Sequence, residues 1–239
     1  MQLYHRYLKL PFNFEKPTLY DSIELKDYCE FIYFKDEDLK TEPILDFIDS
    51  IGLYRIKTNS VYSAPNDGIR VHSDTSDLSD KVKLSFSWGS PDSKTIWWEP
   101  KNYKRVKVVK FYESRMNRTV KCSKLKMLTI KERIRLFLKN KKAENIIKYA
   151  CANESECNKV LERTIDKPSL FNVGRLHSTY NPSSEGRWTL SFILGKKRDM
   201  KPLHFIESLN YFRDYLEKEW KWVKILLNLQ YQMLFLKQE

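Results

Sequence analysis

Two histidines and one aspartate have the residue types and spacing that could form a metal site. His72 and Asp74 lie two residues apart in the stretch RVHSDTSDLSDKVKLSF, which begins at Arg70. Polar and apolar residues alternate there, which predicts strand, and residues i and i+2 of a strand point to the same side. His177 lies near the end of another predicted strand, in FNVGRLHSTYN. Two imidazoles and one carboxylate on one side of a metal leave its other positions open, which is typical of non-haem Fe(II) sites.

Arg187 follows the second histidine by ten residues, across a predicted turn at 181–186. If the flanking strands form a hairpin, Arg187 points inward beside His177, and Thr189 and Ser191 share its face. The opposite face would then carry Trp188, Leu190 and Phe192. An arginine buried near a metal presents a planar fork of donors for a carboxylate. The pattern therefore predicts a carboxylate-binding residue.

The pattern His-x-Asp, then a distant His, then Arg ten residues later resembles the Fe(II)/2-oxoglutarate-dependent dioxygenase superfamily. It is similar to the small aspartyl/asparaginyl-hydroxylase-like and prolyl-hydroxylase-like members, including viral ones, over residues 53–194. The resemblance implies that the four site residues are His72, Asp74 and His177 as Fe(II) ligands and Arg187 on the distal carboxylate of 2-oxoglutarate. It also implies a hydroxylase that uses O₂ to couple decarboxylation of 2-oxoglutarate to C–H oxidation of a substrate.

Three further residues are candidates for holding the C1 end of 2-oxoglutarate, with a purely structural role as the alternative for each. They are Tyr62, which precedes a turn, and Lys83 and Ser85 on the strand after the His-x-Asp pair. Two positions depart from the pattern of the family. Leu176 stands where relatives often have proline. Arg175 shares a predicted strand face with the second histidine, so it would either line the site or mark a rearranged one.

The rest of the chain predicts short strands flanked by helices. EPILDFIDSIG is typical of a helix, which Thr41 can cap, whose first turn Pro43 fits and which Gly52 ends. Helical spacing of apolar residues predicts a helix over 129–150, and a long amphipathic helix or a pair of helices from Leu203 onward. Alternation predicts strands over 53–64, 69–74, 81–89, 94–100, 103–113, 161–166, 169–181 and 186–194.

These elements predict a mainly β fold with flanking helices, namely a double-stranded β-helix barrel of the jelly-roll or cupin kind. We expect a single domain with an N-terminal helical flank, a jelly-roll core, a basic insertion within the core and a long C-terminal helix. The expected bounds are 1–52 for the flank, 53–100 and 159–195 for the core, 101–158 for the insertion and 196–239 for a C-terminal helical brace. That brace would pack on a sheet or mediate homodimerisation.

The net charge of +12 is concentrated in one segment. Residues 101–148 hold 17 lysines and arginines against three acids, so this segment carries +14 and the remainder about −2. Such a block predicts a polyanionic or acidic protein partner. The alternative is a solvated surface without a partner.

Composition indicates an ordered globular protein in a cytoplasmic, reducing compartment. Aromatic residues make up 14% of the chain, and the four cysteines form no CxxC pair. No signal peptide is expected at the start of the chain, and the most apolar stretch, Trp222–Leu236, is broken by polar residues, so no membrane span is expected. His5 and His204 lie outside the predicted strand core and are expected to be surface or packing residues.

Two other functional classes remain open. The first is a non-catalytic cupin-like binding or structural protein, which would dock through the basic insertion and the C-terminal helix. The second is a metal-binding cupin with other chemistry, such as an isomerase. Arg187 discriminates, because neither alternative requires a carboxylate fork there. Trp88, Trp97 and Trp98 lie near the predicted barrel and would either line a substrate cleft or pack in the core.

Overall fold

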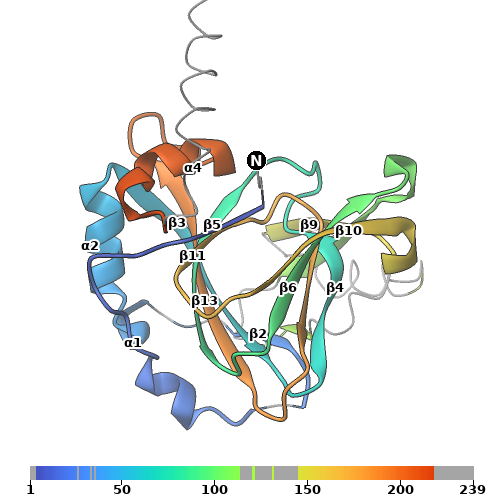
Figure 1. Cartoon of the computed structure of the whole chain (residues 1–239), viewed down its shortest axis with the longest axis horizontal. Coiled ribbons are helices and arrows are strands. Elements are labelled where there is room, and N and C mark those ends of the chain that lie inside the picture. The colour runs from blue at the N-terminus through green and yellow to red at the C-terminus, as the bar shows by residue number, and fades with distance from the viewer. Residues whose placement is uncertain are drawn as a thin grey trace, which may run out of the picture.

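The computed structural model describes residues 4–25, 27–32, 34, 36–113, 120–121, 131 and 145–217. Within these residues the fold is mainly β, with two antiparallel sheets that face each other and a few short helices (Figure 1). The prediction of a mainly β chain with flanking helices is confirmed. Among the described helices, none is both long and apolar enough to cross a bilayer.

The larger sheet contains eight of the described strands in the order β1-β11-β5-β13-β3-β2-β8, with β14 paired to β13. Strand β13 lies at its centre, between β5 and β3, and all its pairings are antiparallel. The strands of this sheet are β1 (His5–Tyr7), β2 (Glu30–Ile32), β3 (Leu53–Ser63), β5 (Val82–Gly89), β8 (Val120–Lys121), β11 (Ser169–Asn172), β13 (Arg187–Lys196) and β14 (Lys201–Pro202).

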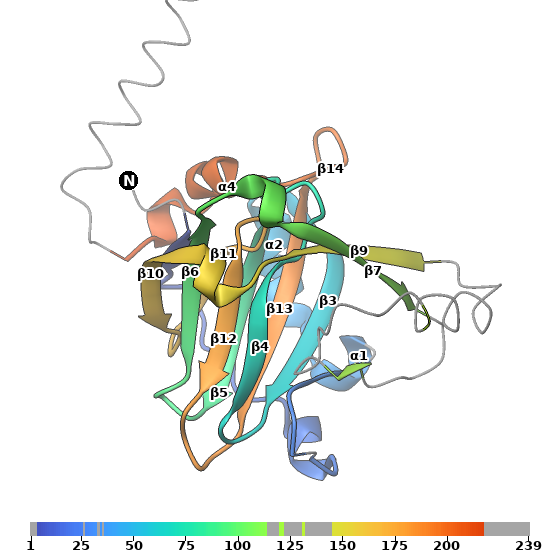
Figure 2. The ribbon, with the colours of Figure 1, turned by 90° about the vertical axis from the view of Figure 1, so that its right-hand side faces the viewer.

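The smaller sheet contains six of the described strands in the order β10-β6-β12-β4-β9-β7. Strand β9 pairs with β4 at two residues only, but with β7 along its whole length, so β7 and β9 extend beyond the sheet as an arm (Figure 2). The strands of this sheet are β4 (Asp67–Ser73), β6 (Lys94–Pro100), β7 (Lys107–Glu113), β9 (Asn145–Cys151), β10 (Cys157–Thr164) and β12 (His177–Asn181).

The helices among the described residues are short. They are α1 (Asp36–Leu39), α2 (Glu42–Ser50), α4 (Phe205–Tyr211) and the 3₁₀ turns η1 (Thr18–Ser22), η2 (Tyr103–Arg105), η3 (Glu154–Glu156) and η4 (Arg213–Tyr215). The predicted helix before β3 is confirmed as α2, which is followed by Gly52 with φ of +80°. Thr41 occupies the N-cap position, but its side chain makes no capping hydrogen bond, contrary to the prediction.

The main hydrophobic core lies between the larger sheet and its helices, not between the two sheets. Helices α1, α2 and α4 cover the outer face of the larger sheet (Figure 1). Apolar residues of α2 and α4 pack there against those of β3, β5 and β13. Members of this core are Ile44, Phe47, Ile48, Leu53, Leu84, Phe86, Leu190, Phe192, Phe205 and Leu209.

Alternation along β5 and β13 places polar side chains on the inner face of the larger sheet. Val82, Leu84 and Phe86 belong to the outer core, whereas Lys83 and Ser85 face a cavity between the sheets. On β13, Trp188, Leu190 and Phe192 pack outward, and Arg187, Thr189 and Ser191 face the same cavity. The inward face predicted for Arg187, Thr189 and Ser191 is therefore confirmed, and strand periodicity accounts for it.

Several predicted elements differ from the structure. Strands β12 and β13 do not form a hairpin: β12 lies in the smaller sheet and β13 in the larger, so residues 182–186 cross from one sheet to the other. The predicted strand 169–181 is two strands in different sheets, β11 and β12. The predicted helix 129–150 is wrong over its last residues, which form β9, and residues 132–144 lie outside the described residues.

The two ends of the chain also differ from prediction. The N-terminal flank is not purely helical, because β1 pairs with β11 and β2 pairs with β3 in the larger sheet. At the other end, α4 ends at Tyr211 and gives way to η4, so no long helix begins at Leu203. The expected packing of this end on a sheet is seen for α4, whose Phe205 and Leu209 are buried in the main core. Residues 218–239, on which the homodimer prediction depends, lie outside the described residues.

Candidate metal centre

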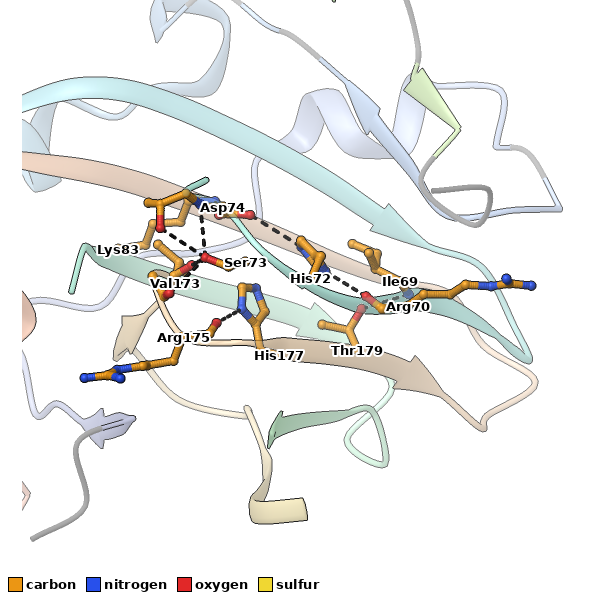
Figure 3. Close-up of polar contacts among 12 residues, drawn as sticks. Ile69, Arg70, His72, Ser73, Asp74, Lys83, Val173, Arg175, His177 and Thr179 are labelled. Carbon is orange, nitrogen blue, oxygen red and sulfur yellow. Dashed lines mark hydrogen bonds and ion pairs between the residues drawn. The ribbon is translucent and has the colours of Figure 1, made fainter. Parts of the chain in front are cut away.

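Strands β4 and β12 bring the two histidines together. They are antiparallel neighbours in the smaller sheet, and His72 and His177 are direct cross-strand partners. Cross-strand partners project from the same face, so both imidazoles point into the space between the sheets. Their ring centroids lie 4.4 Å apart (Figure 3).

Asp74 is the first residue beyond β4, and the backbone holds it beside the histidines. Its N–H donates to the carbonyl oxygen of Val173 at 2.9 Å, and the adjacent Ser73 hydroxyl donates to the Gly174 carbonyl at 2.9 Å (Figure 3). Asp74 Oδ1 lies 3.4 Å from His72 Nε2. One ligand atom from each of Asp74, His72 and His177 lies within 4.8 Å of the others, so the predicted triad is assembled.

The hydrogen bonds of the two rings determine which nitrogen faces the centre. His72 Nδ1 bonds the Arg70 carbonyl at 2.8 Å, and His177 Nδ1 bonds the Arg175 carbonyl at 2.9 Å (Figure 3). A carbonyl oxygen only accepts, so in the neutral rings Nδ1 carries the hydrogen and Nε2 presents a lone pair. Metal-binding histidines typically use this arrangement, with the second nitrogen fixed by a carbonyl.

Electrostatics keep His177 neutral and Asp74 ionised at the point where these groups meet. Burial, followed by the neighbouring His72, lowers the pKa of His177 to about 4, so His177 is neutral near pH 7. Burial alone would raise the pKa of Asp74, but the Lys83 ammonium and the adjacent imidazoles hold it well below its usual range. A carboxylate and imidazole lone pairs thus converge, and such a cluster of acceptors is the ordinary environment of a bound metal ion.

Lys83 forms an ion pair with Asp74. Its Nζ bonds Asp74 Oδ2, while the other carboxylate oxygen, Oδ1, faces His72. The two side chains are 11% and 14% exposed, so the pair is largely removed from water. The sequence named Lys83 only as a candidate for the C1 end of 2-oxoglutarate. A contact with the metal-binding carboxylate was not predicted.

A cavity of about 90 Å³ extends from the triad between the two sheets. Hydroxyl groups dominate its polar lining, and two pairs bridge β5 and β13: Ser85 with Ser191 at 2.9 Å and Ser87 with Thr189 at 3.2 Å. The hydroxyl-bearing serines and threonines of the lining are Ser63, Ser85, Ser87, Ser93, Thr95, Thr179, Thr189 and Ser191. Facing sheets normally bury apolar side chains, so these hydroxyl groups make the cavity a candidate binding site.

Arg187 lines the same cavity as the triad, although it reaches it from the opposite sheet and not from a strand beside His177. It is 6% exposed and donates to the carbonyl oxygens of Ser93, at 3.1 Å, and Ile165. Burial lowers its pKa to about 10, so it remains a cation near neutrality. Among the described residues no carboxylate forms an ion pair with Arg187. Within that part of the chain its charge is therefore not neutralised by a direct ion pair, although Asp166 partly offsets the lowering of its pKa.

Three other residues that the sequence analysis singled out lie away from the cavity. Tyr62 projects from the opposite face of β3 into the outer core, where its ring lies 5.2 Å from that of Trp188, so its predicted role at the C1 end of 2-oxoglutarate is wrong for this conformation. Arg175 points outward and bonds Asp80 Oδ1 at 3.0 Å through Nε (Figure 3). Leu176 is buried in a small outer cluster of the smaller sheet.

The tryptophans and the remaining histidines have structural roles in this conformation. Trp88, Trp97 and Trp98 pack in hydrophobic clusters, and none of them is among the described cavity residues. His5 is a packing residue, as expected, but a fully buried one against Trp97 and Phe171. His204 is exposed at the start of α4, where it forms a capping box.

No family model matches the chain, and no curated protein matches it. The interpretation of the site therefore depends on the geometry described above.

Proposed function

We propose that this protein is an Fe(II)/2-oxoglutarate-dependent oxygenase that hydroxylates a C–H bond. One observation carries the proposal: His72, Asp74 and His177 converge at a cavity that is also lined by Arg187, a buried arginine with no ion-pair partner among the described residues. The proposed cosubstrate, 2-oxoglutarate, requires two things: a metal with open coordination positions at one end and a cation for its distal carboxylate at the other. Simple metal storage would not require Arg187.

The strand order supports a double-stranded β-helix as the scaffold. Along the chain, β3, β5, β11 and β13 fall in the larger sheet and β4, β6, β10 and β12 in the smaller one. Consecutive strands therefore alternate between sheets both before and after the β7–β9 arm. This alternation supports our proposal of a jelly roll with an insertion between its fourth and fifth strands.

The donor set fits Fe(II). Two neutral imidazoles and one carboxylate are the ligands of the facial triad of non-haem Fe(II) oxygenases, and they leave coordination positions for other ligands. In this chain the Nε2 atoms of His72 and His177 and Oδ1 of Asp74 would hold the metal. The two Nδ1 contacts to backbone carbonyls would keep the rings in place during binding.

Arg187 would bind the distal carboxylate of 2-oxoglutarate. The two backbone carbonyls that it contacts hold the guanidinium in place at the cavity wall. The paired hydroxyls of β5 and β13 would line the path between Arg187 and the triad. When bound, Fe(II) and 2-oxoglutarate supply the oxidising chemistry, which couples decarboxylation to hydroxylation with O₂. The chain itself binds and orients these molecules and limits access of water.

Anaerobic titration of the Fe(II)-loaded protein with 2-oxoglutarate tests the proposal. We expect the weak visible charge-transfer band of an Fe(II) chelate to appear and saturate with one equivalent. The same titration on His177→Ala should give no band. A wild-type protein that binds Fe(II) but shows neither a band nor 2-oxoglutarate binding by calorimetry would contradict the assignment.

A second candidate function is a non-catalytic cupin-like binding protein. The Lys83–Asp74 ion pair favours it, because one oxygen of the only acidic side chain among the described cavity residues is already engaged. Succinate formation discriminates between the two functions. The oxygenase should produce succinate from 2-oxoglutarate in the presence of Fe(II) and O₂, even without its substrate, at a low uncoupled rate.

We also propose a polyanionic or acidic protein partner for the basic segment 101–148. Of the side chains that the structure describes there, Lys101, Lys104, Arg105 and Lys107 are exposed around the 3₁₀ turn η2. Tyr103, in the same turn, is 60% exposed. Basic residues interleaved with an exposed aromatic ring are typical of surfaces that bind phosphate backbones.

A further inference from the structure

We propose that Lys83 sets the balance between the metal and the anion that chelates it: its ammonium weakens binding of the metal and strengthens binding of the anionic co-ligand. This inference rests on the metal site of the proposed function. It gives a role to a buried charge that the triad itself does not need.

The placement of Lys83 is the first support. It lies on the inner face of β5, opposite Ile193 of β13 and Phe171 of β11, so its side chain enters the space between the sheets. There its Nζ reaches the Asp74 oxygen that does not face His72. A metal held by the triad would therefore share the Asp74 carboxylate with the ammonium, through the opposite oxygen.

The charges of the cavity are the second support. Its described lining contains one acid, Asp74, and three cations, Lys83, Lys94 and Arg187. Lys94 is paired elsewhere, because its Nζ bonds Glu162 at 2.8 Å on the surface. The buried charges are thus one carboxylate and two cations, so the cavity favours anions before any metal enters.

Lys83 offsets the single negative charge among the ligands of the triad. A divalent metal with two neutral imidazoles and Asp74 alone would form a centre of net charge +1. With the adjacent ammonium the centre carries +2, within a site that excludes most water and screens charges weakly. The added charge repels the metal and attracts an anion bound to that metal. A catalytic metal that must accept and release an anionic co-ligand would use such a balance.

The alternative is that Lys83 only orients Asp74, and the two roles predict opposite results. Loss of a purely orienting partner would weaken metal binding, as loss of such partners typically does by 10–100-fold. Loss of a repelling charge would instead tighten it. The sign of the change in metal affinity therefore distinguishes the roles, without any measurement of turnover.

The experiment compares wild type with Lys83→Met, using Mn(II) as the metal and oxalate as the anion. Mn(II) binding is followed by its EPR signal, and oxalate binding to the Mn(II)-loaded protein by calorimetry. Oxalate chelates a metal but lacks the chain that would extend to Arg187, so it reports on the metal end alone. We expect Lys83→Met to bind Mn(II) at least about tenfold more tightly than wild type. We expect it to bind oxalate about tenfold more weakly.

Three variants control the measurement. Lys94→Met makes the same substitution at a lysine of the same cavity whose charge is paired at the surface, and both affinities should stay within about twofold of wild type. Lys83→Arg retains the charge and should behave like wild type. Lys83→Gln provides a second neutral side chain if Lys83→Met does not fold, and it should shift both affinities in the same directions.

Each remaining outcome overturns the inference in an identifiable way. Weaker Mn(II) binding in the neutral variants would show that Lys83 orients Asp74 and does nothing more. Unchanged affinities for both ligands would show that the ion pair has no part in binding. A wild-type protein that binds no Mn(II), Fe(II) or Co(II) would overturn the proposed function and this inference together.

Discussion

His72 on β4 and His177 on β12 are direct cross-strand partners, and each ring bonds the backbone carbonyl two residues before it. The shared register places both rings on the inner face of the smaller sheet, and the two carbonyls fix their orientation. A cross-strand pair of this kind holds two ligands rigidly without a loop. The third ligand, Asp74, is the first residue after β4, so no further segment is needed to bring it to the histidines.

Removal of any one ligand should abolish metal binding while the protein stays folded. We expect His72→Ala and His177→Ala to lower Fe(II) affinity by more than about 100-fold, since even outer-sphere partners cost 10–100-fold. Asp74→Asn is the gentler change at the third position, because Asp74→Ala would leave the buried Lys83 ammonium unpaired. Anaerobic Fe(II) binding by calorimetry, with circular dichroism for folding, measures the effect.

Ser87→Ala is the matched control for these three variants. Ser87 lines the same cavity and bonds Thr189, but it lies outside the triad. Its loss should leave Fe(II) affinity unchanged. If the three ligand variants retained wild-type affinity at one Fe(II) per chain, the metal would lie elsewhere.

Arg187→Leu should separate cosubstrate binding from metal binding. The substitution removes a buried cation from the cavity but no triad ligand, so Fe(II) affinity should persist. Affinity of the Fe(II)-loaded protein for 2-oxoglutarate should fall by about 3–5 kcal/mol, or roughly two to three and a half orders of magnitude, as a charge-assisted bidentate contact is lost. Calorimetric titration with 2-oxoglutarate measures the loss.

Arg187→Lys tests the geometry of the same contact. A lysine retains the charge but lacks the planar fork, so we expect only part of the 2-oxoglutarate affinity to return. Normal binding of 2-oxoglutarate by Arg187→Leu would remove this residue from the site. Its two contacts to Ser93 and Ile165 would then be purely structural.

Local patterns in the sequence predicted the faces of the strands but not the sheets to which they belong. Alternation alone placed Arg187, Thr189 and Ser191 on one inward face, because the side-chain period of a strand is fixed. The connection at 182–186 has turn residues that suit either a hairpin or a crossing between sheets. Long-range pairing decides between the two, and no local signal reports it.

The remaining differences have similar physical causes. Residues 145–150 follow a stretch with helical spacing, yet they form β9, because pairing with β7 and β4 outweighs local propensity. Tyr62 sits one residue away from the inward-facing Val61 and Ser63, so the strand period sends its ring to the outer core. The triad could be predicted because all three ligands lie at or next to the ends of strands, where the alternation of side chains shows which residues share a face. The Lys83–Asp74 contact depends on the chain path between β4 and β5.

His5 should make the protein sensitive to acid. Burial, and then the nearby Arg163 and Arg6, lower its pKa to about 3, and its Nε2 is buried without a hydrogen-bond partner among the described residues. An unfolded histidine titrates near 6.5. Between these values the unfolded chain binds the extra proton, so the free energy of unfolding falls as pH drops below about 6.5.

His5→Phe should remove this part of the pH dependence while keeping the aromatic packing on Trp97 and Phe171. Urea unfolding at pH 7.5 and pH 5 measures it in both proteins. Wild type should lose about 1–2 kcal/mol more than the variant between those values, since one pKa unit corresponds to about 1.4 kcal/mol. Equal losses in the two proteins would show that the His5 ring is protonated without cost in the native state.

The basic segment should bind polyanions with a steep dependence on salt. If it contacts phosphates, binding releases counterions, and the logarithm of affinity falls by about 0.9 per log unit of salt for each phosphate neutralised on duplex DNA. The double variant Lys104→Glu, Lys107→Glu should lose about two phosphate contacts, because both side chains are exposed, and the slope should become shallower by the corresponding amount. Charge reversal at Lys139, Lys141 and Lys142, which lie outside the described residues, should flatten it further.

Lys40→Glu with Lys201→Glu is the control, because it reverses the same charge at exposed positions on other elements, after α1 and in β14. Filter binding to duplex DNA, RNA and an acidic peptide over a range of salt concentrations gives the slopes. The control should keep the wild-type slope, which separates a local surface from the effect of net charge. Loss of succinate formation in a folded Lys104→Glu, Lys107→Glu protein would place the segment within the active site instead. Equal, salt-independent binding by all proteins would mean that these lysines are only a solvated surface.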